Sequence, residues 1–121
     1  MKKLFILSLC FLLSLTCVRA SLPLTGKTII LDIGHGGDDP GTSYQNILEK
    51  DLNLAIGLEL EKELSRNGAS VILTREGDYD LSSPNAHRRK KSDFDNRIDL
   101  INKSKADVYL SIHINYLEDT S

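Results

Sequence analysis

Three short runs of apolar residues lie along this chain, over residues 28–33, 69–74 and 108–115. Each run is rich in β-branched or aliphatic side chains and is bounded by polar residues or glycine, a pattern that predicts β-strands. In the third run apolar and polar side chains alternate, so the predicted strand has one apolar and one polar face. The polar face carries Tyr109, Ser111, His113 and Asn115.

Two segments between these runs carry apolar residues at helical spacing. A four-residue repeat predicts an amphipathic helix over about 47–67, with Gly68 as its stop. After a polar loop over 76–91, a second helix is predicted over 93–105. The order strand–helix–strand–helix–strand predicts right-handed βαβ crossovers, a parallel-type sheet and the α/β fold class.

The first twenty residues have the layout of a secretory signal peptide. Lys2 and Lys3 precede an uncharged apolar run over 4–18, and small residues flank Arg19 at a cleavage site after Ala20. The run is short for a membrane span, which needs about 20 apolar residues. We therefore expect residues 1–20 to be a leader and 21–121 to be exported to the extracellular space, cell wall or periplasm. Membrane contact is expected only if the leader stays uncleaved as an anchor.

The composition of residues 21–121 excludes two kinds of chemistry. Both cysteines, Cys10 and Cys17, lie in the leader, so cysteine-ligated metal and a cysteine nucleophile are excluded. Three of the fifteen basic residues and none of the seventeen acidic ones also lie there, which leaves a formal net charge of −5. Since a nucleic-acid binder needs a basic surface, we expect no nucleic-acid partner.

Two histidines are predicted to meet at one edge of the sheet. His35 follows the first strand in a glycine-rich loop over 34–41, and His113 lies near the end of the third. In parallel sheets, ligands bind outside the carboxyl ends of the strands. Two imidazoles and one carboxylate can hold Zn²⁺ with a fourth position open for water, which favours hydrolysis over simple binding. A satisfied core histidine is the alternative for His113.

The identity of the carboxylate ligand stays open on spacing alone. Glu49 is favoured because the start of the first helix lies at the same sheet edge as His35, whereas Glu59 lies several turns away and Asp51 also competes. Glu49 also stands three residues after Asn46, the spacing of a capping box, in which the two residues exchange hydrogen bonds at a helix start.

Polar residues near this edge have two readings each. Arg75 ends the second strand, where it either binds a substrate carboxylate or oxyanion or pairs with Glu76 or Asp78. Asn115 either hydrogen-bonds an amide substrate or starts a turn. The basic run 88–91 is either a solvated loop or a contact for an anionic wall polymer or a partner. For Arg97 we expect an ion pair, on the helix surface or structural, over substrate contact.

Four motifs in order resemble the zinc-dependent N-acetylmuramoyl-L-alanine amidases of the type-3 family (amidase_3). They are the D-x-G-H-G-G-x-D-P-G opening at 32–41, E-K-D-x-N-L at 49–54, L-T-R at 73–75 and S-I-H-x-N at 111–115. The resemblance implies that His35, Glu49 and His113 bind Zn²⁺ and that water cleaves the amide between N-acetylmuramic acid and L-alanine in peptidoglycan. Arg75 and Asn115 are the candidate substrate contacts.

The family's domain continues past the second histidine, and its catalytic glutamate lies near the end of that part. Because Glu118 is too close to His113 to be this residue, we expect the general base beyond Ser121. Residues 21–121 are then the N-terminal part of a single amidase catalytic domain. The basic segment 88–94 before Arg97 resembles the germination-type branch, which acts on spore cortex.

Two other functions compete with the amidase. One is a different zinc hydrolase, such as a peptidase or a deacetylase. The other is a catalytically incomplete fragment that binds the wall or a protein partner. Peptidoglycan is the expected substrate, and an accessory protein that assists zinc loading is left open.

Overall fold

The structure, a computed structural model, describes residues 21–116; the predicted leader and residues 117–121 lie outside the described part. A central sheet is formed by strands β1 (Thr28–Ile33), β4 (Ser70–Leu73) and β5 (Val108–Ile112). Two helices, α2 (Glu49–Arg66) and α3 (Arg89–Ser104), connect them, and two short strands, β2 (Ser43–Tyr44) and β3 (Ile47–Leu48), precede α2. The α/β fold class is confirmed.

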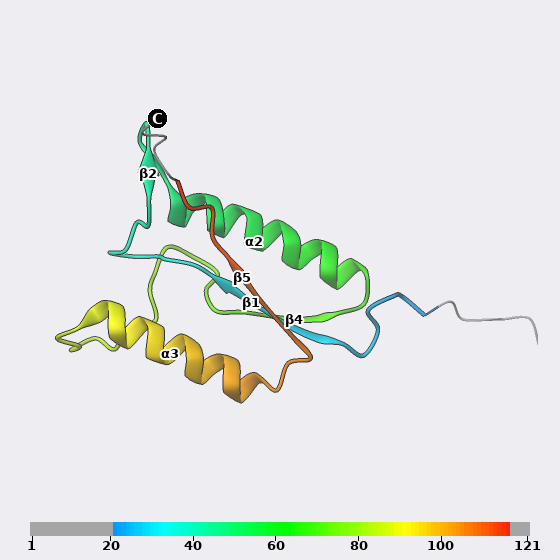
Figure 1. The fold of residues 1–121 in the computed structure, drawn as a ribbon. Helices are drawn as coiled ribbons and strands as arrows, with labels where there is room; N and C mark the ends of the chain where they lie inside the picture. The colour runs from blue at the N-terminus through cyan, green and yellow to red at the C-terminus, as the bar shows by residue number, and fades with distance from the viewer. Residues whose placement is uncertain (1–20, 117–121) are drawn as a thin grey trace, which may run out of the picture.

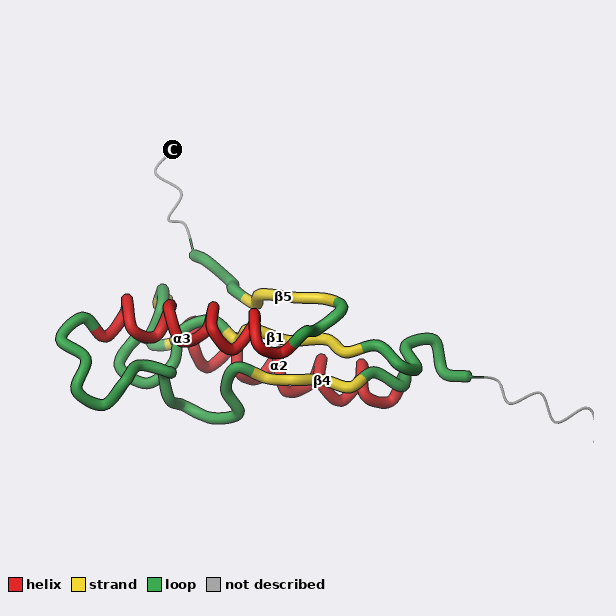
Figure 2. Tube along the Cα trace, turned by 90° about the horizontal axis from the view of Figure 1, so that it is seen from below, coloured by secondary structure: helices red, strands yellow, loops and turns green. Residues whose placement is uncertain are grey.

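The sheet is parallel, as predicted, with the strand order β4-β1-β5. Helix α2 covers one face and α3 the other, so the sheet lies between two helical layers (Figure 1). Figure 2 shows the three strands side by side, with β1 between its two neighbours. Because the three strands run in the same direction, the loops that follow β1, β4 and β5 meet at one edge of the sheet.

The described core is concentrated in β1. Its residues Ile29, Ile30, Leu31 and Ile33 are the buried hydrophobic side chains of the described segment. On the α2 side, a Cβ added to Gly57 would lie 2.6 Å from Ile33 Cδ1, so this glycine lets the helix approach the strand closely. Ile33 faces α2, and because side chains alternate along a strand, Ile30 and Asp32 face α3. The central strand is therefore covered by a helix on both sides, as is usual in a parallel sheet.

The opposite face of the sheet, under α3, carries a network of polar side chains. Asp32 on β1 is buried there, and Thr74, Tyr109 and Ser111 donate hydrogen bonds to its carboxylate from the strands on either side. Arg97 from α3 pairs with Asp32 at 2.8 Å and with Asp93 at 2.9 Å. The structural ion pair predicted for Arg97 is confirmed, and the alternate polar face of the third strand is explained by this network.

The first helix begins two residues later than predicted. Residues 47 and 48 pair with 43 and 44 in a two-stranded antiparallel hairpin, and its turn residues Gln45 and Asn46 have φ of 47° and 67°. Two central residues with positive φ favour a tight hairpin, and asparagine tolerates that region. Leu48 occupies the N-cap position without a side-chain cap bond, so the capping box between Asn46 and Glu49 is wrong.

The second helix begins four residues earlier than predicted, at Arg89, and takes in most of the basic run. Arg89 pairs with Asp80 at 2.8 Å, Lys90 pairs with Asp39 at 3.1 Å, and Lys91 pairs with an aspartate one turn on. Three of the four basic residues in 88–91 pair with acidic partners but remain exposed to solvent. The run is therefore a solvated helix start and not a loop, and its contact with an anionic polymer stays a prediction.

The third strand ends at Ile112, three residues before its predicted end. His113 therefore lies just beyond the strand, and Asn115 has a φ of 46°, a left-handed backbone conformation. Neither α2 nor α3 has the length and apolar character that a bilayer crossing requires, within residues 21–116.

Candidate metal centre

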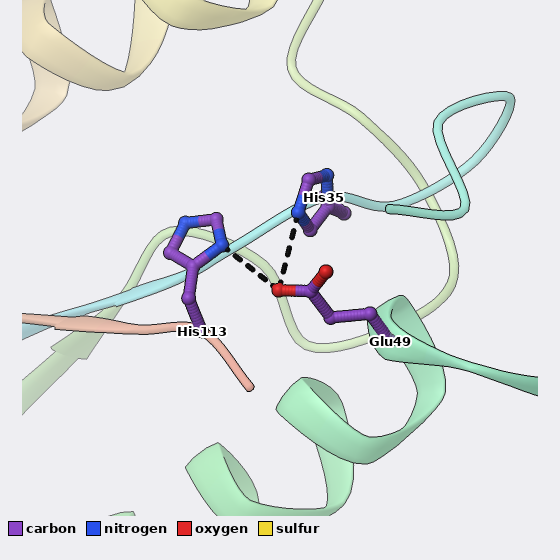
Figure 3. Close-up of side chains that lie close together, drawn as sticks. All are labelled: His35, Glu49 and His113. Carbon is purple, nitrogen blue, oxygen red and sulfur yellow. Dashed lines mark hydrogen bonds and ion pairs between the residues drawn. The ribbon is translucent and has the colours of Figure 1, made fainter. Parts of the chain in front are cut away.

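Three side chains from distant parts of the chain converge at the predicted edge of the sheet (Figure 3). His35 follows β1, Glu49 is the first residue of α2, and His113 follows β5. The Oε1 atom of Glu49 lies 3.3 Å from His35 Nε2 and 3.1 Å from His113 Nδ1. One ligand atom from each residue lies within 4.8 Å of the other two. The structure thus brings the predicted group together.

Glu49 is nearly fully buried and its carboxylate is well supplied with hydrogen-bond donors. The N–H and the hydroxyl of Thr42 donate to Oε2 at 2.9 and 2.8 Å, and the N–H groups of Ile114 and Asn115 approach Oε1 at 3.2 and 3.4 Å. Burial raises the pKa of Glu49, but hydrogen bonds from Thr42, His113 and Asn115 outweigh it and lower the pKa well below its usual range. The residue therefore carries a negative charge at neutral pH.

The hydrogen-bonding partners of His35 favour a metal cation in this group. An ionised carboxylate can only accept hydrogen bonds. The Nδ1 atom of His35 lies 3.0 Å from Asp39 Oδ2, while its Nε2 faces Glu49. An imidazole between two carboxylates can donate to both only as the imidazolium. A metal cation between Nε2 and Glu49 satisfies the same geometry with a neutral ring.

The chemistry and spacing of the group fit zinc. Zinc binds imidazole nitrogen and carboxylate oxygen at about 2.0–2.2 Å, so neighbouring ligand atoms of a tetrahedral site lie about 3.3–3.6 Å apart. The two separations at Glu49 Oε1, 3.1 and 3.3 Å, are close to this range. Three protein ligands leave one position open, and the side chains of His35 and His113 are 20% and 38% exposed. Solvent therefore reaches the group from the side of the two histidines.

The loop that carries His35 is held by two buried arginines. His35 has a φ of 63°, a left-handed conformation that is unfavourable for a residue with a Cβ. Arg75 donates to the carbonyls of Ile33 and Gly34, each at 3.1 Å, and Arg97 donates to those of Ile33 and His35 at 2.7 and 2.8 Å. Three successive carbonyls are thus fixed by two guanidinium groups, which hold the strained loop in place.

The position of Arg75 does not fit the substrate contact predicted from sequence. Its side chain is 1% exposed, and its remaining donors bond the carbonyls of Gly77 and Lys50. Because these partners are backbone carbonyls, the guanidinium of Arg75 does not form the predicted ion pair with Glu76 or Asp78 either. We correct the role of Arg75 to support of the loop.

The other predicted residues are placed as follows. Asn115 lies beside Glu49 with an exposed side chain, so its substrate contact stays a prediction. Asp51 and Glu59, the competing carboxylates, are exposed and lie outside the metal-type group. Two further residues of the site were not predicted from the sequence: Asp39, which bonds His35, and Thr42, which bonds Glu49. The tight glycine loop brings the chain back toward His35 within four residues, and this could have indicated Asp39. No pattern in the sequence indicates Thr42.

The fold and the site together define an α/β domain with a three-ligand group of the kind that holds a catalytic metal. The family model described as "N-acetylmuramoyl-L-alanine amidase" (Amidase_3) matches residues 29–121, and the chain belongs to this family. The resemblance drawn from the four motifs is confirmed.

Relatives of this chain carry amidase names. It is 47% identical over 98 residues to the germination-specific N-acetylmuramoyl-L-alanine amidase of Bacillus subtilis, covering 78% of this chain and 41% of the relative. It is 40% identical over 103 residues to a probable cell wall amidase, LytH, of Staphylococcus aureus, covering 82% and 30%. The chain thus spans less than half the length of these relatives.

Solved amidase structures share the fold. The CwlD amidase of Clostridioides difficile, in complex with the GerS lipoprotein, superposes with a TM-score of 0.73 at 42% identity, covering 78% of this chain and 51% of that one. The amidase AmiC2 of Nostoc punctiforme gives a TM-score of 0.63 at 28% identity, covering 78% and 48%. The described strands and helices therefore correspond to about half of each solved chain.

Proposed function

We propose that this chain supplies the zinc-binding part of a peptidoglycan hydrolase that cleaves the amide between N-acetylmuramic acid and L-alanine. The observation that carries the proposal is the convergence of His35, Glu49 and His113 in a member of the amidase family. A peptidase or deacetylase would use a similar zinc site, but the amidase relatives favour the muramoyl amide as the bond that is cut.

In this proposal the metal is held by His35 Nε2, His113 Nδ1 and Glu49 Oε1. When bound, zinc would polarise the amide carbonyl and lower the pKa of a water molecule. The chain keeps Glu49 ionised through its bonds from Thr42 and the backbone after β5. The chain thus provides two neutral imidazole rings and one negatively charged carboxylate. Because Zn²⁺ carries two positive charges, the loaded site would keep a net positive charge near the carbonyl of the substrate.

Two glycines leave room for these ligands. A Cβ added to Gly34 would lie 2.4 Å from ring atoms of His113, and one added to Gly41 would lie 2.6 Å from the ring of His35 and 2.8 Å from Glu49 Oε2. Both distances are far below an ordinary contact between carbon atoms, which is about 3.5–4.0 Å. The glycines of the opening motif therefore serve the packing of the three ligands.

A cleft next to the two histidines offers space for substrate. It has a volume of about 290 Å³ and includes Lys90, Phe94, Tyr109 and Ser111 in its lining. Phe94 is 62% exposed and Tyr109 48% exposed, so both rings are accessible from the cleft side of the sheet. We propose that the cleft receives the wall polymer, with Asn115 as an additional polar contact. The general base, which would also protonate the leaving amine, is proposed to be the glutamate expected beyond Ser121.

We also propose export through residues 1–20, because peptidoglycan lies outside the cytoplasmic membrane. Membership of the germination branch is proposed from the segment 88–94 and is supported by the identity to the germination-specific amidase of Bacillus subtilis. An accessory protein partner is proposed as well, supported by the complex of the Clostridioides difficile relative with a lipoprotein.

Zinc content of the purified chain tests the site. We expect one zinc per chain in the wild type, and loss of that zinc in His35→Ala and in His113→Ala. His87→Ala is the matched control, because His87 is an exposed histidine of the loop before α3 and should keep the zinc. Unchanged zinc in both ligand variants would reject the site.

Product analysis on purified muropeptides tests the reaction. Release of peptides with a free L-alanine amino group from lactyl-bearing glycan supports the amidase. Released acetate or cut peptide bonds would instead support a deacetylase or a peptidase. Zinc binding without any turnover, including in a longer form of the protein that carries the proposed glutamate, would favour a wall-binding or partner-binding module.

A further inference from the structure

We propose that Asp39 is a positioning residue, which fixes His35 in the tautomer whose unprotonated Nε2 faces the metal position, and that Lys90 holds Asp39 in place. This inference rests on the proposed zinc site and adds a residue to it. The two imidazoles that face Glu49 differ within residues 21–116: His35 has a second carboxylate, that of Asp39, on its far side, and His113 has none.

The carboxylate of Asp39 determines which nitrogen of His35 carries the proton. Its Oδ2 atom lies 3.0 Å from His35 Nδ1. Because a carboxylate only accepts, this contact is a hydrogen bond only when Nδ1 carries the hydrogen. The neutral ring then has its lone pair on Nε2, the atom 3.3 Å from Glu49 Oε1. Histidines that bind metals commonly donate their other N–H to a carboxylate in this way, which sets tautomer and ring orientation.

Asp39 is itself held by contacts to its second oxygen and to its backbone. Lys90 Nζ lies 3.1 Å from Oδ1, and the N–H of Gly41 donates to the same oxygen at 3.4 Å. The backbones of Gly36 and Asp39 exchange two hydrogen bonds of 3.0 Å. Oδ1 thus has Lys90 and Gly41 as partners, which leaves Oδ2 directed at the imidazole of His35.

Helix α3 contributes to this arrangement through its early start. Lys90 lies in the first turn of α3, in the segment predicted to be a loop, and from there it reaches the glycine loop after β1. Its side chain is 83% exposed. Exposed ion pairs contribute little, so the effect of Lys90 on His35 should be small compared with that of Asp39.

His113 is the internal comparison. Its Nδ1 faces Glu49, and its Nε2 packs against Gly34, where an added Cβ would lie 2.4 Å away. Among residues 21–116, no carboxylate stands behind this ring as Asp39 stands behind His35. The two histidines thus present different nitrogens to the metal position, and loss of Asp39 should affect only one of them.

The test measures zinc affinity of the whole chain by competition with a chromophoric chelator. We expect Asp39→Ala to weaken zinc binding by about 10–100-fold, the usual effect of removing a carboxylate behind a metal-bound histidine. Asp39→Asn should fall between Asp39→Ala and the wild type, because its amide oxygen still accepts from Nδ1. Asp38→Ala is the matched control: this adjacent acid has an 83% exposed side chain that points to Arg89, and it should leave the affinity within about twofold.

A second measurement reads the tautomer without zinc. In the metal-free chain at about pH 9, above the usual pKa of imidazole, ring nitrogen chemical shifts should report a proton on Nδ1 of His35. Asp39→Ala should lose this preference and leave His113 unchanged. An Nε2-protonated His35 in the wild type, or equal zinc affinities of Asp39→Ala and Asp38→Ala, would overturn the proposal. A wild type that keeps this tautomer but binds no zinc would support the positioning role and contradict the proposed function.

Discussion

His35 and His113 follow neighbouring strands of one sheet but are held in very different ways. His35 extends β1, whose apolar residues are fully buried, and the loop around it is bonded by Arg75 and Arg97. His113 extends β5, an edge strand whose residues from Val108 to Leu110 are 40–48% exposed. One half of the site is therefore fixed by the core, and the other half is fixed mainly by the contacts of His113 with Glu49 and Gly34.

The largest effect is expected from breaking the support of the fixed half. Arg97→Met removes the partner of the buried Asp32 and two hydrogen bonds to the loop carbonyls. Loss of one partner from a buried ion pair costs about 3–5 kcal/mol. We expect the free energy of unfolding in urea to fall by that amount. Lys103→Met, which removes an exposed pair with Asp99, is the control and should cost less than about 1 kcal/mol.

The two strands can be compared through a matched pair of leucines. Leu31 and Leu110 are direct neighbours across β1 and β5, but Leu31 is 0% exposed and Leu110 is 40% exposed. Leu31→Ala should lower the free energy of unfolding by about 2–5 kcal/mol, the usual cost of a buried leucine. Leu110→Ala should cost less than about 1 kcal/mol in the same urea titration. Equal losses would show that β5 is as well packed as β1 and would remove the basis of the comparison.

Disturbing the contact between Gly34 and His113, which joins the two halves, is expected to have an intermediate effect on the free energy of unfolding. A methyl group at Gly34 would collide with the ring of His113, and overpacking of this kind costs about 1–3 kcal/mol. Gly34→Ala should therefore both destabilise the chain and weaken zinc binding in chelator competition. Gly77→Ala is the control, since its added Cβ would meet nothing closer than 3.3 Å. Unchanged zinc affinity in Gly34→Ala would mean that His113 does not need this close approach.

The smallest effect concerns acid stability at the start of α3. Burial raises the pKa of Asp80, but hydrogen bonds from Ser82 and Arg89 outweigh it and lower the pKa below its usual value of 3.8. A lowered pKa adds stability at pH values above the unfolded pKa, and this stability is lost as pH falls through the folded value. Asp80→Asn should therefore cost about 1 kcal/mol near pH 7.

The same difference between wild type and Asp80→Asn should shrink on acidification below about pH 4. Urea titrations at several pH values measure it. A difference that stays constant down to strongly acidic pH would mean that the carboxylate is not preferentially stabilised in the folded chain.

The features that sequence predicted well are those set by local pattern and strand direction. The apolar runs give the three strands, and parallel connections bring His35 and His113 to one edge. Glu49 could be favoured over Glu59 by the same geometry. The missed features depend on partners that are distant or lie in the backbone. Arg75 bonds main-chain carbonyls, which leave no signature in a sequence.

The boundaries of the elements were missed for related reasons. The early start of α3 depends on ion pairs from Arg89 and Lys90 to residues far back in the chain. The hairpin before α2 has strands of two residues each, too short for a periodic pattern, and is defined by the turn at Gln45 and Asn46.

Anomalous X-ray diffraction at the zinc absorption edge, from crystals of the zinc-loaded chain, would locate the metal itself. We expect a single strong peak about 2.0–2.2 Å from each of three atoms, His35 Nε2, His113 Nδ1 and Glu49 Oε1. A peak bound to other residues, or no peak at the junction of β1, α2 and β5, would show that these three side chains do not form a zinc site.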